Sequence, residues 1–166
     1  MKLDPQVAAM GFELRPVGPG DEEFLYRVYA STRHEELAQT GWPRDQIAAF
    51  LRMQFDAQSR YYQEHYSETS FDVILADGSP IGRLYVARWP EEIRIVDIAL
   101  LPAYRGAGIG TKLLEGLISE SEASAKPLSI HVERFNPALR LYGRLGFREV
   151  EDKGVYLLMQ RAPAKG

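Results

Sequence analysis

The chain has 166 residues, of which 45% are apolar and 26% are charged, and its net charge is −3. This length suits one domain with a sizeable core and is short for two, and the composition is typical of a soluble globular protein. The acidic balance argues against nucleic-acid binding, because there is no basic surplus to replace the counterions along a phosphate backbone.

Cysteine is absent, so the sequence offers no disulfide, no thiolate metal ligand and no thiolate nucleophile for a covalent acyl-enzyme. The three histidines, His34, His65 and His131, lack the paired spacing of zinc sites, and we expect no metal. No stretch approaches the ~18 apolar residues of a membrane span, and the N-terminus lacks the pattern of a signal peptide. We therefore expect a cytoplasmic protein without a membrane partner.

The N-terminal half is predicted to form a strand, two helices and a β-hairpin. Residues 12–17 form the strand, residues 21–32 a helix capped by Asp21, and residues 44–65 a second helix with an apolar and aromatic stripe. Residues 71–76 and 81–89 are rich in β-branched and aromatic side chains, and the turn cluster at 77–80 separates them. These two runs are predicted to pair as a hairpin.

The C-terminal half is predicted to contain a βαβ unit. Residues 93–101 form a nearly continuous apolar strand, a helix follows and ends at Lys126-Pro127, and residues 128–133 form the next strand. Parallel strands need such a crossover, which is almost always right-handed. Asn136-Pro137 opens a further helix that Gly146 ends, and residues 147–151 and 155–161 close the chain as antiparallel strands. The fold class is α/β with a mixed sheet.

A glycine-rich loop, RGAGIGT at residues 105–111, joins the strand at 93–101 to the helix. Its glycines allow backbone N–H groups to turn toward one point, and the helix N-terminus adds unpaired N–H groups and a positive end. This arrangement suits a phosphate or pyrophosphate. The alternative is that the glycines only permit a tight turn.

The spacing of this loop does not fit either of two familiar phosphate-binding motifs. A Walker loop does not fit, because Thr111 stands between Gly110 and Lys112. The dinucleotide fingerprint G-x-G-x-x-G does not fit either, since the loop reads G-x-G-x-G. Glu133 nevertheless ends the following strand where a ribose-binding carboxylate would lie, so nucleotide binding stays open as an alternative.

Two segments resemble the GNAT superfamily of N-acyltransferases. IALLPAYRGAGIG at 98–110 matches the family's apolar strand, proline and Arg/Gln-x-x-Gly-x-Gly/Ala loop, and NPALRLYGRLGF at 136–147 matches its Asn, helical Tyr and Gly-Phe signature. The resemblance implies one domain over residues 1–166, with a cofactor-binding core at about 93–150 and an acceptor-specificity region at about 12–90. It also implies a mostly antiparallel central sheet with one βαβ crossover and helices on both faces.

The resemblance further implies acetyl-CoA, or another acyl-CoA, as co-substrate and an amine as acceptor. The pyrophosphate would lie on the loop amides, and the pantetheine arm would pair with the first strand where the two parallel strands splay. The implied cofactor contacts are Ile98, Leu100, Arg105, Gly106, Ala107, Gly108, Ile109, Gly110, Thr111 and Asn136. The oligomeric state is open, with a homodimer as one alternative.

Acyl transfer to an amine needs a neutral nucleophile, a stabilised oxyanion and a proton for the leaving thiolate. By resemblance Tyr142 is the general acid; the alternative is a packed aromatic ring. Many family members have a glutamate where this chain has Arg94, so a glutamate-based mechanism does not carry over. Asp97 is a candidate amine anchor or base, because a carboxylate in an apolar strand is costly unless it is functional or paired with Arg83 or Arg94.

We therefore expect an N-acetyltransferase that transfers acetyl from acetyl-CoA to a primary amine of a small molecule or peptide by direct attack in a ternary complex. The alternatives are a non-catalytic CoA- or nucleotide-binding module of the same fold, or an interaction domain with a vestigial loop. Tyr142 and Asn136 together favour the enzyme. His131 and Glu133 are lower-ranked candidates for the same cleft, because most such strand residues are structural. Tyr61, Tyr62 and Tyr66 with Glu35 and Glu36 are a candidate substrate wall, and the equal alternative is core and solvated helix surface.

Overall fold

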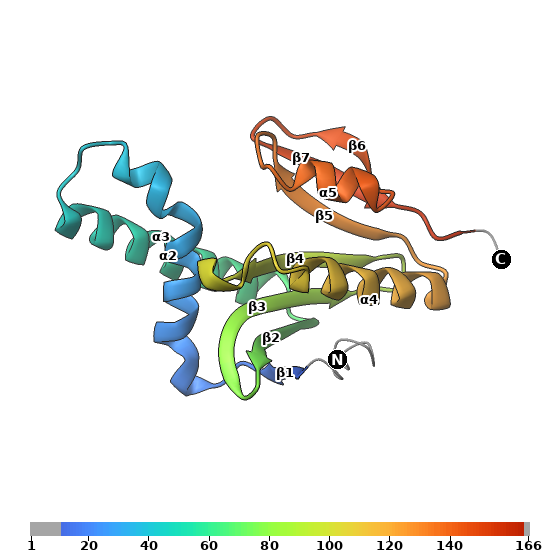
Figure 1. Cartoon of the computed structure of the whole chain (residues 1–166). Coiled ribbons are helices and arrows are strands. Elements are labelled where there is room, and N and C mark those ends of the chain that lie inside the picture. Colours follow the sequence, from blue (N-terminus) through green and yellow to red (C-terminus); the bar gives the residue numbers. More distant parts are fainter. Residues whose placement is uncertain (1–10, 165–166) are drawn as a thin grey trace.

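The computed structural model describes residues 11–164, which form seven strands and four α-helices (Figure 1). In chain order the elements are β1 (Phe12–Pro16), the 3-10 turn η1 (Pro19–Asp21), α2 (Glu22–Ala38), α3 (Arg44–His65), β2 (Thr69–Ala76), β3 (Ser79–Arg88), β4 (Ile93–Leu100), η2 (Pro102–Tyr104), α4 (Ile109–Ser124), β5 (Leu128–Glu133), α5 (Leu139–Arg144), β6 (Arg148–Asp152) and β7 (Tyr156–Arg161). Residues 1–10 and 165–166 of the predicted domain lie outside the described range.

The strands form one mixed sheet in the order β1-β2-β3-β4-β5-β7-β6. Only β4 and β5 pair in parallel, and α4 connects them, which confirms the predicted βαβ unit. All other neighbours are antiparallel, including the predicted hairpin of β2 and β3 and the closing pair of β6 and β7. The mostly antiparallel sheet predicted from the sequence is confirmed.

The two parallel strands diverge soon after they meet. Their register contains only three pairs, from Ile93↔Leu128 to Ile95↔Ile130. Beyond Ile95 the remaining half of β4 pairs with β3 alone, and Figure 1 shows β5 leaving the plane of β4 together with β6 and β7. The backbone groups of β4 on this side are thus free of β5, which confirms the predicted splay.

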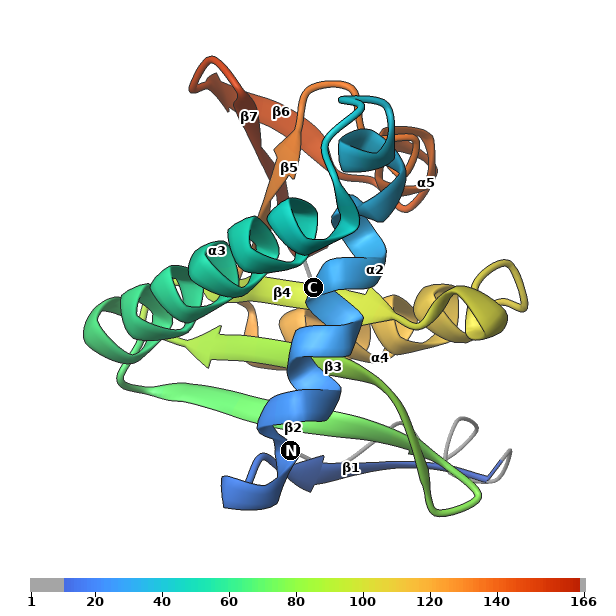
Figure 2. The same ribbon diagram turned by 90° about the vertical axis from the view of Figure 1, so that its left-hand side faces the viewer.

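Helices cover both faces of the sheet, as predicted, and each face has its own core. Figure 2 shows α2 and α3 crossing in front of β2 to β4, with α4 behind them. Leu113 and Leu117 of α4 pack with Ile95 and the other apolar strand residues in one buried cluster. Tyr29 of α2 and Phe55 of α3 belong to a separate cluster on the opposite face. Each helix packs against its face of the sheet because its apolar side chains form a stripe along one side of the helix.

The first helix differs from the prediction in length and in its N-terminus. It continues to Ala38, six residues past the predicted end, because Leu37 extends the buried stripe and the first helix breakers are Gly41 and Pro43. Asp21 stands at the N-cap position, but its side chain makes no capping bond to the helix. Its carboxylate accepts from Arg15 and the Gly18 N–H instead, so the predicted capping role is wrong.

The short helix before β6 also begins later than predicted. Asn136 Oδ1 accepts a hydrogen bond from the Ala138 N–H at 2.8 Å, and Leu139 N–H donates to the Asn136 carbonyl. This Asx turn uses the capping chemistry of Asn three residues ahead of the helix, which starts only at Leu139. Gly146 ends the helix with φ +97°, as predicted.

Candidate functional site

A cavity of about 690 Å³ opens where β4 and β5 diverge. Its walls come from strands β3, β4, β5 and β7, helices α2, α3 and α5, and the segment between β6 and β7. Four of the predicted catalytic and cofactor-binding residues line it together: Asp97, Ile98, Asn136 and Tyr142. Leu100 and the loop at 105–111 are not part of this lining; they follow it along the chain at the end of β4.

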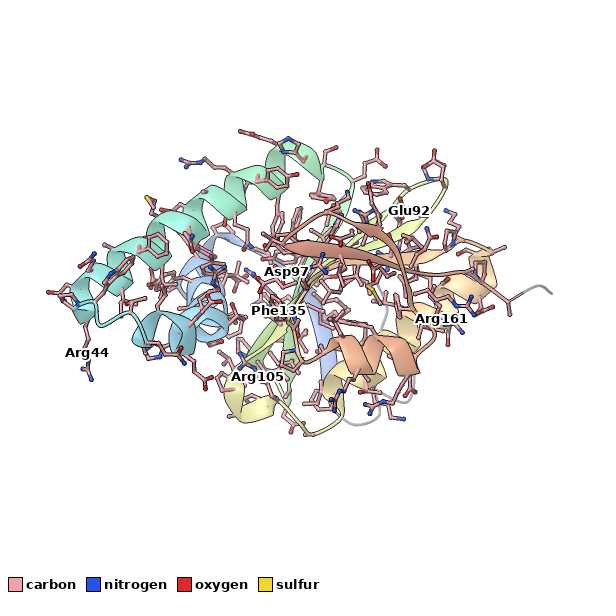
Figure 3. The ribbon with its side chains drawn as sticks, turned by 90° about the horizontal axis from the view of Figure 1, so that it is seen from above. Arg44, Glu92, Asp97, Arg105, Phe135 and Arg161 are labelled. Carbon is pink, nitrogen blue, oxygen red and sulfur yellow. The ribbon has the colours of Figure 1, made fainter. Side chains whose placement is uncertain are left out.

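A β-bulge aims two charged side chains into this cavity. The register of β3 with β4 jumps from Tyr85↔Asp97 to Val86↔Ile95, so Val96 is the extra residue. Without the bulge, residues three apart would face opposite sides of the strand. With it, Ile95 packs toward the α4 side while Arg94 and Asp97 both line the cavity. Figure 3 shows Asp97 near the middle of the molecule, between Glu92 and Arg105.

The Asp97 carboxylate is held through one of its oxygens. Oδ2 accepts from Arg83 Nη2 at 2.7 Å and from the Tyr62 hydroxyl at 3.0 Å. Oδ1 has no hydrogen-bond partner among the described residues, and the side chain is 14% exposed and lines the cavity. The ion pair that the sequence offered as an alternative is therefore formed with Arg83, not Arg94, and it leaves one carboxylate oxygen for a ligand.

Burial shapes the protonation of the groups around Asp97. Burial, the largest single influence, opposes the charge of Arg83, but Asp97, Tyr85 and Tyr62 together raise the pKa of the guanidinium above its usual value. Burial and the charge of Asp97 also raise the pKa of Tyr62 far above its usual range. Both partners thus keep their protons and donate to Asp97 at neutral pH.

Tyr142 lies on α5 and reaches the same cavity. Its ring packs edge-on against Phe147, with 5.6 Å between ring centroids. Burial, followed by the charge of Asp97, raises the pKa of the Tyr142 hydroxyl to about 12. The hydroxyl is protonated at neutral pH and has no hydrogen-bond partner within residues 11–164, so it is available to donate to a ligand.

The glycine-rich loop has the backbone geometry expected of an anion cradle. Gly106 and Gly108 have φ +76° and +84°, and a Cβ built at either would meet no atom within 4 Å. The amides of residues 106–111 donate to no acceptor in the described part of the chain, because α4 begins at Ile109 and its first N–H groups are unpaired. These open glycines and free amides fit a pyrophosphate.

Arg105 ties this loop to its neighbours. Its Nε donates to the Leu100 carbonyl at 3.0 Å and its Nη2 to Ser31 Oγ at 3.1 Å. The predicted phosphate contact of Arg105 thus comes from a guanidinium that already links the end of β4 to α2. One nitrogen, Nη1, makes no hydrogen bond within the described residues.

Most residues of the predicted substrate wall lie at the cavity. Tyr61, Tyr62, Tyr66 and Glu36 line the cavity, whereas Glu35 does not. The rings continue onto the sheet: Tyr62 meets Tyr85 edge-on at 5.8 Å and Tyr66 stacks on Trp89 at 6.0 Å between centroids. His131 and Glu133 line the cavity too. Burial, followed by the charge of Arg94, lowers the pKa of His131, so the imidazole is neutral.

Several lining residues carried no signal in the sequence. Tyr29 and Gln58 lie on helical stripes that look like ordinary core or surface, and Lys153 and Tyr156 flank a turn between short strands. Arg83 was recognisable in the sequence, because a charged side chain inside an apolar strand is unusual, as it is at Asp97. Within residues 11–164 no helix is long and apolar enough to cross a membrane, and no group of three or more side chains is arranged to hold a metal ion.

Comparison with known proteins identifies relatives of the chain. The sequence profile of the Acetyltransferase (GNAT) family matches residues 25–147. An N-alpha-acetyltransferase of Saccharolobus solfataricus is 31% identical over 132 residues, which cover 68% of this chain and 79% of that protein. The [ribosomal protein bS18]-alanine N-acetyltransferase of Haemophilus influenzae is 37% identical over 67 residues, which cover 40% of this chain and only 46% of that protein.

The fold has solved counterparts as well. The crystal structure of the PaiA N-acetyltransferase of Thermoplasma acidophilum in complex with coenzyme A superposes with a TM-score of 0.69. The sequences are 19% identical, and the match covers 92% of this chain and 99% of that one. At this identity the likeness concerns the fold.

Proposed function

The chain belongs to the Acetyltransferase (GNAT) family, and we propose that it is an acetyl-CoA-dependent N-acetyltransferase that acts on a primary amine by direct attack in a ternary complex. The observation that carries the proposal is the gap between β4 and β5. In one cavity, this gap brings together the part of β4 that does not pair with β5, the Tyr142 hydroxyl and the oxygen of Asp97 that accepts no hydrogen bond from the described residues.

The residues divide into a cofactor half and an acceptor half. We assign the pyrophosphate to the amides of residues 105–111, the pantetheine to the free edge of β4 at Ile98 and Leu100, and a contact near the sulfur to Asn136. The open space at Gly106 and Gly108 supports this assignment. When bound, acetyl-CoA supplies an activated acyl group and a thiolate leaving group.

Two side chains act on the transfer itself. The Oδ1 oxygen of Asp97 orients the amine of the acceptor, since Oδ2 is occupied by Arg83 and Tyr62. The Tyr142 hydroxyl donates its proton to the departing thiolate, which its raised pKa of about 12 allows near neutrality. The proton that the attacking nitrogen loses as the amide forms passes through solvent and restores the Tyr142 hydroxyl. Because Asp97 is already paired with a cation, we assign it to anchoring the amine and not to strong base catalysis.

Among primary amines, we propose the α-amine of a peptide as the acceptor. The relatives named N-alpha-acetyltransferase and ribosomal protein alanine N-acetyltransferase support this choice. The aromatic wall of Tyr61, Tyr62 and Tyr66 offers contact area for a peptide chain beside Asp97. The cytoplasmic location, the domain limits and the homodimer alternative remain predictions from the sequence.

Release of free CoA from acetyl-CoA, measured with a thiol reagent, tests this function. The acceptors are peptides with a free α-amine, the same peptides with a blocked α-amine, and small primary amines. We expect CoA release only with free α-amines, and an acetylated peptide in the mass spectrum. Tight CoA binding without transfer to any acceptor would favour the non-catalytic module instead.

A further inference from the structure

The acceptor side of the cavity ends in a cationic group that the proposed chemistry does not use. Arg94 lines the cavity at the closed end of the splay, where it is the register partner of Ser129. Its side chain is 11% exposed. Many members of the family that the sequence resembles have a glutamate at the position of Arg94. This chain therefore has a positive charge where a negative charge is common.

The guanidinium of Arg94 is fixed in place by neighbours that leave part of it free. Its Nε donates to Ser129 Oγ at 2.7 Å, and its plane lies 5.3 Å from the centroid of the Trp89 ring. Its Nη1 lies 3.4 Å from His131 Nδ1, which must accept, because arginine has only donors. The neutral imidazole described above is consistent with that role. An arginine held in this way loses little entropy when it binds a ligand.

The remaining donors are not consumed by the nearest carboxylate. Glu92 Oε1 is 3.6 Å from Arg94 Nη2, beyond hydrogen-bond distance, and its other oxygen accepts from Ser129. Nη2 makes no hydrogen bond within the described residues, and one of the two Nη1 protons is also free. The fork of a guanidinium matches the two oxygens of a carboxylate.

Four cationic and three acidic side chains line the cavity. Arg83 pairs with Asp97, and Arg33 pairs with Glu36, so both of these cations are offset within the lining. The other two cations, Arg94 and Lys153, form looser ion pairs of 3.6 Å each with Glu92 and Glu151, whose side chains lie outside the lining. Glu133 is the remaining acidic group that lines the cavity, and it is exposed.

The spacing along β4 sets the distance between the reacting amine and this charge. Asp97 and Arg94 are three residues apart on β4, but the bulge at Val96 takes up one of these positions, so the separation along the strand is only about 7 Å. A peptide bound in an extended form covers about 3.3 Å per residue, so a side chain of its second or third residue spans this distance from the α-amine. A carboxylate there reaches Arg94 while the amine lies at Asp97.

We propose that Arg94 binds a carboxylate of the acceptor, so that the preferred substrate is a peptide with a free α-amine and an acidic second or third residue. This inference rests on the proposed function and names the substrate class of the same site. The free donors of the Arg94 guanidinium then favour acidic peptides over basic ones.

Peptides that differ only in charge test the proposal on the unaltered protein. One series carries Glu or Gln at the second residue and another carries Glu or Gln at the third, all with the same free α-amine. In at least one of the two series, we expect kcat/KM to be about 10- to 100-fold higher for the Glu peptide than for the matching Gln peptide. This is the size of effect that a charge-assisted hydrogen bond gives. Both peptides are predicted to be acetylated, so the comparison does not depend on a variant.

Variants then assign the preference to one side chain. Arg94→Gln should bring the Glu peptide down to the level of the Gln peptide, and Arg94→Glu should make a Lys peptide the better acceptor. Arg94→Lys should keep part of the preference, because the charge remains and the planar fork is lost. Arg148→Gln is the matched control: it removes the same charge from the exposed edge strand β6 and should preserve the preference.

The possible failures are distinguishable. Equal kcat/KM for Glu and Gln peptides, with both acetylated, overturns the carboxylate subsite and leaves the proposed function intact. A preference that survives Arg94→Gln overturns the assignment to Arg94. Transfer to none of the peptides or amines overturns the proposed function and the subsite together.

Discussion

Arg83 Nη2 on β3 donates to Asp97 Oδ2 on β4 over 2.7 Å, and the two side chains are 4% and 14% exposed. The pair is diagonal across neighbouring strands, because Asp97 faces Tyr85 in the register. It fixes the carboxylate on one oxygen and turns the other toward the cavity. The orientation of the proposed amine anchor therefore depends on a buried cation of the neighbouring strand.

Breaking this pair should destabilise the protein strongly. Arg83→Met leaves the Asp97 charge poorly compensated, and Asp97→Asn leaves a buried guanidinium unpaired, so each should cost about 3–5 kcal/mol of unfolding free energy. The double variant should cost clearly less than the sum, since neither charge is left alone. Urea unfolding measures all three values. Simple additivity of the two changes would show that the charges do not interact.

Tyr142→Phe tests the proposed proton donor while keeping the packed ring. The single-turnover rate should fall by about 10² to 10⁴, whereas the Kd for acetyl-CoA should change little. Because the folded pKa of about 12 keeps the hydroxyl protonated, its donation is lost only as the pH rises through that value. The wild type should therefore show no loss of rate from Tyr142 between about pH 7 and 10. An unchanged rate in Tyr142→Phe would reduce this residue to packing.

Much of the architecture could be predicted from local patterns. The strand before the loop, the loop itself and the helix after it are continuous in the sequence, so their chemistry is legible without tertiary information. The splay between β4 and β5 followed from the family resemblance, and their register confirms it. Asp97 was recognisable because a lone carboxylate in an apolar strand needs a reason.

The acceptor side was less predictable, because it depends on register. The bulge at Val96 brings Arg94 and Asp97 to one face, and nothing in the local composition marks that residue as extra. The Asx turn at Asn136 and the helix start at Leu139 have a similar origin, since an Asn-Pro pair is compatible with both a cap and a turn. Contacts from α2 and α3, such as Gln58 with Arg83, exist only once the helices cross the sheet.

The cradle can be tested with two glycines of the same backbone conformation. Gly108 and Gly41 have φ +84° and +77°, and a Cβ at either would meet no atom within 4 Å. Valine at either position therefore imposes a similar backbone strain, of order 1–2 kcal/mol. Only Gly108→Val should weaken acetyl-CoA binding, by at least about tenfold, because only Gly108 lies in the phosphate loop. Isothermal titration compares the two variants, and equal affinities would contradict the cradle.

The acid stability of the protein should depend on Asp21. Hydrogen bonds from Arg15 and from the Gly18 N–H lower the pKa of this carboxyl from its usual 3.8 to about 2. A depressed folded-state pKa stabilises the protein fully above about pH 4, and this stabilisation is lost as the pH falls through about 2. Asp21→Asn should reduce Tm at neutral pH and flatten the decline of Tm between these values. A parallel decline in the variant and the wild type would exclude this origin.

The central claim is that acetyl passes directly from acetyl-CoA to an amine bound beside Asp97. The most direct measurement is a single-turnover reaction of excess protein with labelled acetyl-CoA and a peptide that has a free α-amine. The intact masses of the protein and of the peptide are followed over time. The account predicts that the label appears on the peptide, at its α-amine, and at no time on the protein. Two results would contradict it: acetyl-CoA that is bound but keeps its label in the presence of the peptide, or label that appears on the protein before it appears on the peptide.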